Sequence, residues 1–295
     1  MADTMLSFND NSLSTDFLSM DDLRKACPAA FKTAPTNPNV SERYVHANTA
    51  TVVEDLAKLG WLPVQAKQCR PKKNSKGIRS FHMIAFQNPE VKISKMVENS
   101  DGTTTEIVDS YPRIILTNSH DGFNSFKFMV GLFRLVCSNG LVVCSDEMVN
   151  MSIRHINYDF EALRKVVASA IEQVPQITCT MNTMKNTTLT EANKKELATA
   201  VVKVRKEMDD NQQIELDEAT IMDILMPVRE EDKGDDLWTV FNVCQEKLIK
   251  GGFQATGKND KVRKQRKITS IKKDVEYNQR LWEIATKFMP DTVAA

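Results

Sequence analysis

The class of fold is indicated by two neighbouring stretches, Trp61-Leu62-Pro63-Val64-Gln65-Ala66 and Ser80-Phe81-His82-Met83-Ile84-Ala85-Phe86. Both look like strands, and the second is rich in aromatic and branched residues. The loop between them is polar and contains Asn74, Ser75 and Gly77. Two strands joined by such a loop pair as an antiparallel hairpin. The sequence therefore predicts an antiparallel sheet in the first half of the chain.

Further elements extend this pattern on either side of the hairpin. Apolar residues recur at helical spacing over 49–59, and Gly60 is a natural end for that helix. Another strand is expected at 113–117, after a turn at 99–102, and 126–143 holds a further strand or buried element. The sheet is therefore expected to have at least one helix packed against it.

The second half of the chain has the pattern of a helical region. Apolar residues follow three-and-four spacing in 160–171, 197–204 and 221–225. Two more helices are expected at 236–249 and 275–288. The predicted fold class is α+β, with a mainly antiparallel sheet and a packed helix followed by a C-terminal helical region.

Three regions follow from composition along the chain. Residues 1–22 hold five aspartates and no Lys or Arg, which is typical of a solvated leader that can be mobile. Residues 23–157 form the predicted sheet domain, and 158–295 form the helical region, which includes a basic segment at 258–273. A short helix, capped by Asp21, is expected where the leader meets the sheet domain.

Bulk composition excludes several classes of protein. The 39 basic and 39 acidic residues cancel, so only local patches can attract a polyanion. No apolar run is long enough to span a bilayer, and the N-terminus lacks the pattern of a secretory signal, so no membrane partner is expected. Six scattered cysteines and four histidines without metal-ligand spacing predict a cytoplasmic protein with no metal and no cofactor.

The first local patch is the loop of the predicted hairpin. It places six positive charges in thirteen residues with no acid among them: Lys67, Arg70, Lys72, Lys73, Lys76 and Arg79. A basic hairpin beside aromatic strand residues can neutralise a phosphate backbone while rings stack on bases. The alternative is a loop kept polar for solubility.

The second patch is the basic segment 258–273, where Asp260 is the single acid. Phosphate contacts are expected from the residues in its middle, Lys261, Arg263, Lys264, Arg266 and Lys267. The alternative is a linker between helices whose charges pair with an acidic stretch such as Glu230-Glu231-Asp232.

The stretch Asn118-Ser119-His120-Asp121-Gly122 gathers an amide, a hydroxyl, an imidazole and a carboxylate just after a predicted strand. A His-Asp pair can act as acid and base or hold a metal, but no further ligands or catalytic groups complete a site. Asp-Gly after a strand also forms a tight turn, with Asn118 and Asp121 bonding their own backbone. The turn is the favoured interpretation, and no catalytic residue is assigned.

Several motifs together resemble one family. They are Ser41-Glu42-Arg43-Tyr44, Gly60-Trp61-Leu62-Pro63, Asn118-Ser119-His120-Asp121-Gly122, the stretch from Gly131 to Leu141 with Arg134, Asn139 and Gly140, the stretch from Asp236 to Asn242, and Asn278-Gln279-Arg280-Leu281-Trp282. Over about Leu23 to Met289 the chain resembles the phage- and plasmid-like family catalogued as a domain of unknown function, DUF932. The resemblance implies a protein of a phage, prophage or plasmid in a bacterial cell, and it assigns no reaction.

The order of the predicted elements is similar to the core of single-strand annealing proteins of the recombination-mediator superfamily, which implies DNA binding and a homo-oligomer. The first hypothesis is therefore a non-enzymatic protein that binds DNA, single-stranded DNA above all. The second is a protein that binds and inhibits a host factor, such as a defence or restriction system. An enzyme using His120 and Asp121 is a third, for which a full set of catalytic roles is lacking.

Overall fold

The computed structural model of the 295-residue chain describes residues 17–40, 44, 46–69, 80–124, 126–134, 140–143, 160–208, 216–256 and 261–290. The N-terminal elements are α1 Met20–Ala26, η1 Pro28–Phe31, α2 Thr49–Lys58, β1 Leu62–Gln68, β2 His82–Gln87, β3 Ile93–Glu98, β4 Thr104–Asn118, β5 Lys127–Arg134 and β6 Gly140–Val143. The C-terminal elements are α4 Phe160–Asn186, α5 Glu191–Met208, α6 Glu218–Leu225, η2 Glu230–Asp232, α7 Leu237–Lys250, β7 Gln254–Thr256, β8 Val262–Lys264 and α8 Ile271–Thr286. The predicted α+β class is confirmed.

The main sheet is antiparallel, with strand order β1-β2-β4-β5-β6 and with β3 paired to one end of β4. The predicted hairpin is confirmed, because β1 and β2 pair from Leu62 opposite Gln87 to Gln68 opposite His82. The strand expected at 113–117 is much longer, since β4 begins at Thr104. Its first half leaves the sheet and pairs only with β3 among the described strands.

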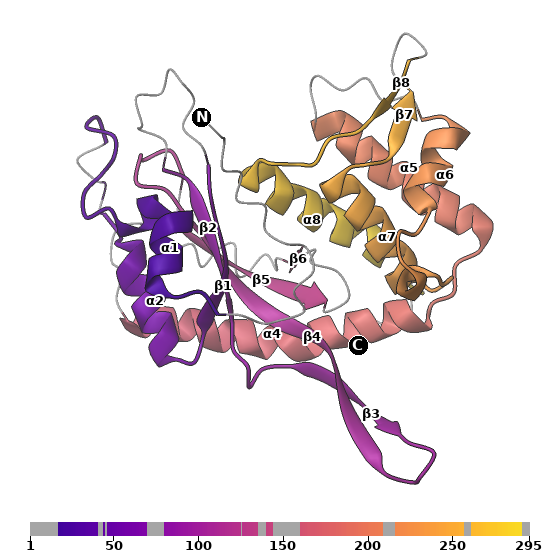
Figure 1. Ribbon diagram of the computed structural model, residues 1–295, viewed down its shortest axis with the longest axis horizontal. Coiled ribbons are helices and arrows are strands. Elements are labelled where there is room, and N and C mark those ends of the chain that lie inside the picture. Colours follow the sequence, from indigo (N-terminus) through magenta and orange to yellow (C-terminus); the bar gives the residue numbers. More distant parts are fainter. Residues whose placement is uncertain are drawn as a thin grey trace.

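This pairing of β3 with β4 forms a two-stranded arm that projects from the body of the protein (Figure 1). The turn predicted at 99–102 lies at its tip, where the Gly102 amide donates to the Asn99 carbonyl across 3.0 Å. Strand β3 was missed by the sequence analysis. Most of its side chains are exposed on both faces of the arm. Its sequence therefore lacks the alternation of apolar and polar residues that predicts a half-buried strand.

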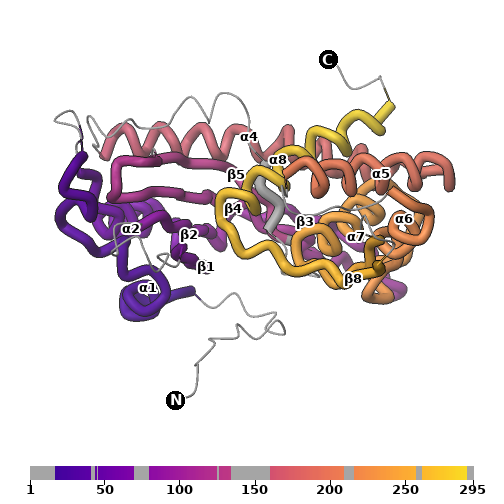
Figure 2. The backbone as a smooth tube through the Cα atoms, turned by 90° about the horizontal axis from the view of Figure 1, so that it is seen from above, coloured from indigo at the N-terminus to yellow at the C-terminus, as the bar shows by residue number. Residues whose placement is uncertain are grey.

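The two faces of the sheet meet different helices. Residues such as Ile114 and Leu116 of β4 point into the large core, together with Leu56 of α2 and Leu163 of α4. The residues between them face the other way, where Ile115 belongs to a smaller cluster with Ile271 of α8. Figure 2 shows α4 along one side of the sheet. Helix α8 packs against the face that carries Ile115. The large core continues into the C-terminal helices, so both halves of the chain share it.

Two predicted boundaries shift for local reasons. Helix α1 is capped by Ser19 rather than Asp21, because Ser19 and Asp22 form a reciprocal capping box. Helix α8 begins at Ile271, capped by the Ser270 hydroxyl, and so starts inside the predicted basic segment. None of the helices in the described ranges is long and apolar enough to cross a membrane.

Part of the basic segment is a strand and not a plain linker. Strand β8 pairs with β7, and the Gln265 amide donates to the Phe253 carbonyl across 2.8 Å. The buried Arg205 of α5 donates to the carbonyls of Leu248 and Arg266 at 2.8 and 2.9 Å. The backbone that carries the exposed cations is therefore fixed to α7 and α5.

Candidate functional site

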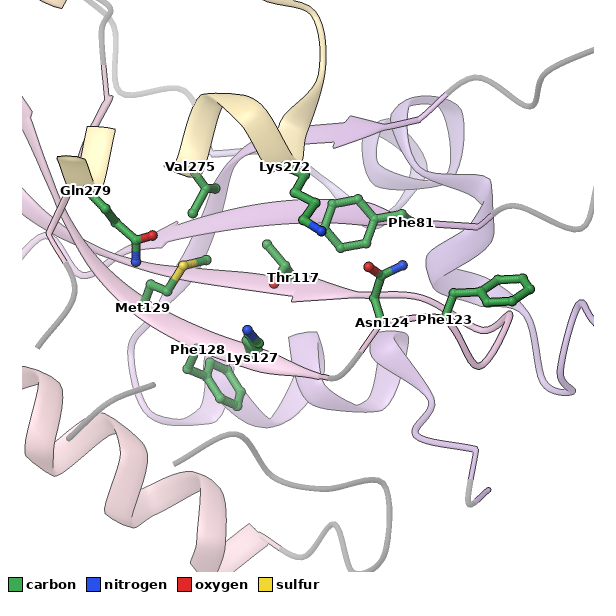
Figure 3. A pocket seen from close by; sticks show the side chains of 10 residues that line it. All are labelled: Phe81, Thr117, Phe123, Asn124, Lys127, Phe128, Met129, Lys272, Val275 and Gln279. Carbon is green, nitrogen blue, oxygen red and sulfur yellow. The ribbon is translucent and has the colours of Figure 1, made fainter. Parts of the chain in front are cut away.

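A pocket of about 350 Å³ lies between α8 and the face of the sheet that carries Ile115 and the smaller cluster (Figure 3). Its walls combine aromatic, apolar, amide and basic side chains. They are Phe81, Thr117, Phe123, Asn124, Lys127, Phe128, Met129, Lys272, Val275 and Gln279. Residues of the predicted sheet domain and of the predicted helical region therefore line the pocket together.

Strand register and helix periodicity bring these side chains together. Thr117 of β4 stands opposite Lys127 of β5, and directly paired residues of antiparallel strands point to the same face. On α8 the lining residues Lys272, Val275 and Gln279 are spaced by three and four, so they share one face of the helix. Figure 3 shows this helix face above the strands.

The pocket carries two cations and an accessible ring. Lys127 and Lys272 are exposed, and neither forms an ion pair with another residue in the described ranges. Phe123 is 72% exposed, which is unusual for a side chain of its size and hydrophobicity. An exposed ring beside ammonium groups can bind a ligand that has both a flat face and negative charge.

The motif Asn118 to Gly122 shapes the loop that carries Phe123 and Asn124. The Asp121 carboxylate accepts from the Ser119 hydroxyl at 2.6 Å and from the Phe123 amide at 3.0 Å. The Asn118 side-chain oxygen accepts from the Ser119 amide at 2.7 Å. The structure thus contains the turn favoured by the sequence, with both side chains bonding backbone groups. These bonds fix the backbone next to Phe123 and Asn124, which line the pocket.

The histidines of this region are part of the same buried network. His82 is fully buried; its Nδ1 lies 2.7 Å from the Ser80 carbonyl and its Nε2 lies 3.0 Å from the Thr49 hydroxyl. Nδ1 must donate to the carbonyl, so Nε2 accepts from Thr49. Burial lowers the pKa of His82 from 6.5 to about 4, so it is neutral at pH 7. The neighbouring His120 is also buried, with its ring 5.3 Å from that of His82.

Nothing in the described ranges forms a group of three or more His, Cys, Asp or Glu side chains that could hold a metal ion. The Asp121 carboxylate is used by the loop, since its second oxygen also lies 3.4 Å from the Ser80 amide. Asp121 and His82 are thus buried and hydrogen-bonded within the fold, whereas Phe123, Lys127 and Lys272 are exposed in the pocket.

The predicted basic residues fall into three groups. Lys67 is the residue before the last in β1 and pairs with Asp274 of α8 across 3.2 Å, although its side chain is 40% exposed. The cations of the second patch, Lys261, Arg263, Lys264, Arg266 and Lys267, are all exposed, and none has a side-chain partner in the described part of the chain. Arg70, Lys72, Lys73, Lys76, Arg79 and Asn139 lie outside the described residues. Arg134 ends β5 and Gly140 begins β6.

The acidic stretch considered as an alternative partner of the second patch is used locally. Glu230 pairs with Lys233 at 2.6 Å, and Asp232 pairs with Arg229 at 2.9 Å. Arg229 also forms an ion pair with Glu246 of α7. Glu230 and Asp232 therefore pair with cations of their own segment, which leads into α7.

One residue of the second basic stretch and one residue just beyond the first line the pocket. Lys67, at the start of the first stretch, contacts α8 through Asp274, and Phe81 just beyond that stretch lines the pocket. Lys272, near the end of the second stretch, lines the opposite wall. Phe123 and Lys127 line the pocket but were not predicted from the sequence. An apolar residue directly after Asp121-Gly122 was the signal that could have identified Phe123.

Fold and site define an α+β protein in which an antiparallel sheet and a helical region share a basic, aromatic pocket. The chain matches the family model described as Domain of unknown function (DUF932) over residues 38–282, and it belongs to this family. It is 29% identical to the UPF0380 protein YafZ of Escherichia coli (strain K12) over 273 residues, which are 91% of this chain and 90% of that protein. It is 28% identical to the UPF0380 protein YfjQ of the same strain over 271 residues, again 91% and 90%. No solved structure matches the chain.

Proposed function

We propose that this protein binds nucleic acid without catalysing a reaction on it, and that single-stranded DNA is the preferred form. The observation that carries the proposal is the group of five exposed cations at 261–267, which have no side-chain partner in the described ranges. Unpaired cations at fixed positions attract phosphate by releasing the counterions of the nucleic acid. The segment leads directly into α8 and its pocket.

Several features support single strands over duplex. The pocket opens beside an exposed ring, and a base can reach such a ring only when it is not stacked in a helix. The resemblance to annealing proteins favours the same substrate and adds a homo-oligomer to the proposal. The bacterial relatives are compatible with a protein that acts in the cytoplasm of a bacterial cell, encoded by a phage or plasmid.

Neutralising the basic segment is expected to weaken DNA binding and its salt dependence together. Fluorescence anisotropy at two salt concentrations would compare the full chain with a variant carrying Arg263→Gln, Lys264→Gln and Lys267→Gln. Every phosphate that the variant no longer neutralises lowers the slope of log affinity against log salt by about 1, and we expect the affinity at low salt to fall about 10-fold.

The matched control removes the same charge from α1, β3 and α4, with Lys25→Gln, Lys95→Gln and Lys165→Gln, all exposed positions. It is expected to bind as the wild type does. Absence of binding to single-stranded and duplex DNA at low salt would contradict the proposed function, and so would equal reductions of affinity in the two triple variants.

Binding of a host protein is a second candidate function, favoured by the projecting arm. The arm exposes Met96 by 64% on one face and Ile107 by 44% on the other, and the outer half of β4 pairs with β3 alone among the described strands. An exposed strand edge with apolar side chains can receive an extended segment of another protein. We propose such a segment of a host protein as the ligand of the arm.

The arm is tested by affinity capture from a bacterial lysate with the wild type and with a Met96→Lys, Ile107→Lys variant. A specific protein retained by the wild type and absent from the arm variant is the expected result. Thr104→Lys is the control, because it adds a charge at an exposed position of the same arm without removing an apolar side chain. Identical captures by all three proteins would rule out the arm as the binding surface.

A further inference from the structure

We infer that the pocket between the sheet and α8 is a site for one unstacked nucleobase of a single strand, with the neighbouring phosphates held by Lys127 and Lys272. The inference rests on the proposed function, because it names the part of the nucleic acid that this pocket takes. Four properties of the pocket lead to it: its volume, its apolar surface, its amide groups and the placement of its cations.

The volume fits a small planar group. Ligand pockets in proteins usually measure about 300–1,000 Å³, and this one, at about 350 Å³, is at the lower end. It lies between a flat sheet face and one helix, so its opening is bounded by two opposed walls (Figure 3). A single base with its sugar is a ligand of suitable size.

The apolar part of the wall suits an aromatic ligand. Met129 belongs to the smaller cluster, and Val275 packs against it. Phe81 also packs against this cluster and is half-buried. Phe123 is the exception, since it stands at the rim with most of its surface in solvent. The Phe123 backbone amide donates to the Asp121 carboxylate. Every base has a π-face, so an exposed ring offers stacking without sequence preference.

Amide and hydroxyl groups add hydrogen bonds for the edge of a base. Gln279 projects from α8, Asn124 from the loop and Thr117 from β4. An amide carries both donors and an acceptor, which is the combination that base edges present. Their positions on three different elements place them around the pocket rather than on one side.

The two cations lie on opposite walls. Lys127 comes from β5 and Lys272 from α8, and neither pairs with a carboxylate in the described ranges. A nucleotide within a strand has a phosphate on each side of its base, so two separated ammonium groups match its charge. The carboxylates of an acidic peptide could pair with the two lysines, but carboxylates alone would not account for the exposed ring of Phe123.

The test compares two oligonucleotides of about 12 residues, an oligothymidylate and a strand of equal length in which the bases are replaced by abasic units. The wild type is expected to bind the base-bearing strand about 10-fold more tightly, and Phe123→Leu should lose this preference while keeping its affinity for the abasic strand. Phe17→Leu is the matched control, since Phe17 is also exposed, at 39%, and lies outside the pocket. Lys272→Gln should weaken the binding of both strands.

The outcomes separate the two proposals. Equal binding of both strands by the wild type would overturn the nucleobase site and leave phosphate binding intact. A preference that survives Phe123→Leu unchanged would also overturn it, because the base would then bind elsewhere. If neither strand binds at low salt, the proposed function itself fails. A preference for an acidic aromatic peptide over both strands would assign the pocket to a protein ligand and overturn the inference.

Discussion

Gly251→Ala is expected to lower the free energy of unfolding by about 4 kcal/mol, as the combined cost of a backbone conformation that only glycine adopts readily and of steric overlap. Gly251 caps α7 with φ 71° and ψ −152°. A Cβ at this position would lie 2.6 Å from the Arg266 carbonyl carbon and 2.6 Å from the Gln265 oxygen. Both atoms are backbone, so they cannot rotate away. The strand-like path of the basic segment would have to shift.

The matched control is Gly102→Ala at the tip of the arm. Gly102 also has a positive φ, of 78°, but an added Cβ would meet nothing within 4 Å. It isolates the conformational cost, expected to be about 1 kcal/mol. Urea unfolding followed by circular dichroism gives both values. Similar decreases of stability in the two variants would show that the packing of Gly251 against the basic segment is not tight.

Sequence reasoning located the parts of the fold that have a regular hydrophobic pattern. Strand β2 was predicted because its residues are buried on both sides, between the large core and α8. Strand β3 was missed because Ser94 and Lys95 lie on an arm with solvent on both faces. Burial is what imposes periodicity on a strand, so a projecting ribbon leaves no such trace.

The candidate site was predictable only in part. Charge density alone led to the prediction that Arg263 and Lys264 contact phosphate, because a run of cations is visible without knowing the fold. The pocket could not be found in this way, since Phe123, Lys127 and Gln279 are far apart in the chain and are brought together by strand register and by α8. The sequence also could not show that the Asp121 carboxylate, in a motif that looks catalytic, bonds the Ser119 hydroxyl and the Phe123 amide of the loop beside the pocket.

Acidification from pH 6.5 to pH 4 is expected to cost the folded protein about 3 kcal/mol through His82 alone. Burial lowers the pKa of this imidazole from 6.5 to about 4, against the smaller opposing effects of its bond to the Ser80 carbonyl and of the Asp121 charge. Above pH 6.5 both the folded and the unfolded states hold a neutral ring, so His82 makes no pH-dependent contribution. Below it, the unfolded state takes up the proton first, and stability falls until the folded state is protonated near pH 4.

His82→Gln isolates this effect from the carboxylates that titrate over the same range. The amide of Gln can still donate to the Ser80 carbonyl or accept from Thr49, but it carries no proton that depends on pH. Urea unfolding of wild type and variant at pH 7, 6, 5 and 4 gives the difference in stability at each pH. We expect the variant to be less stable at pH 7, because Gln does not fit both partners, and the gap to narrow by about 3 kcal/mol on the way to pH 4. A gap that stays constant would mean that His82 already takes up its proton in the folded state at the ordinary pH, and that the network around Thr49 and Asn118 is open to solvent.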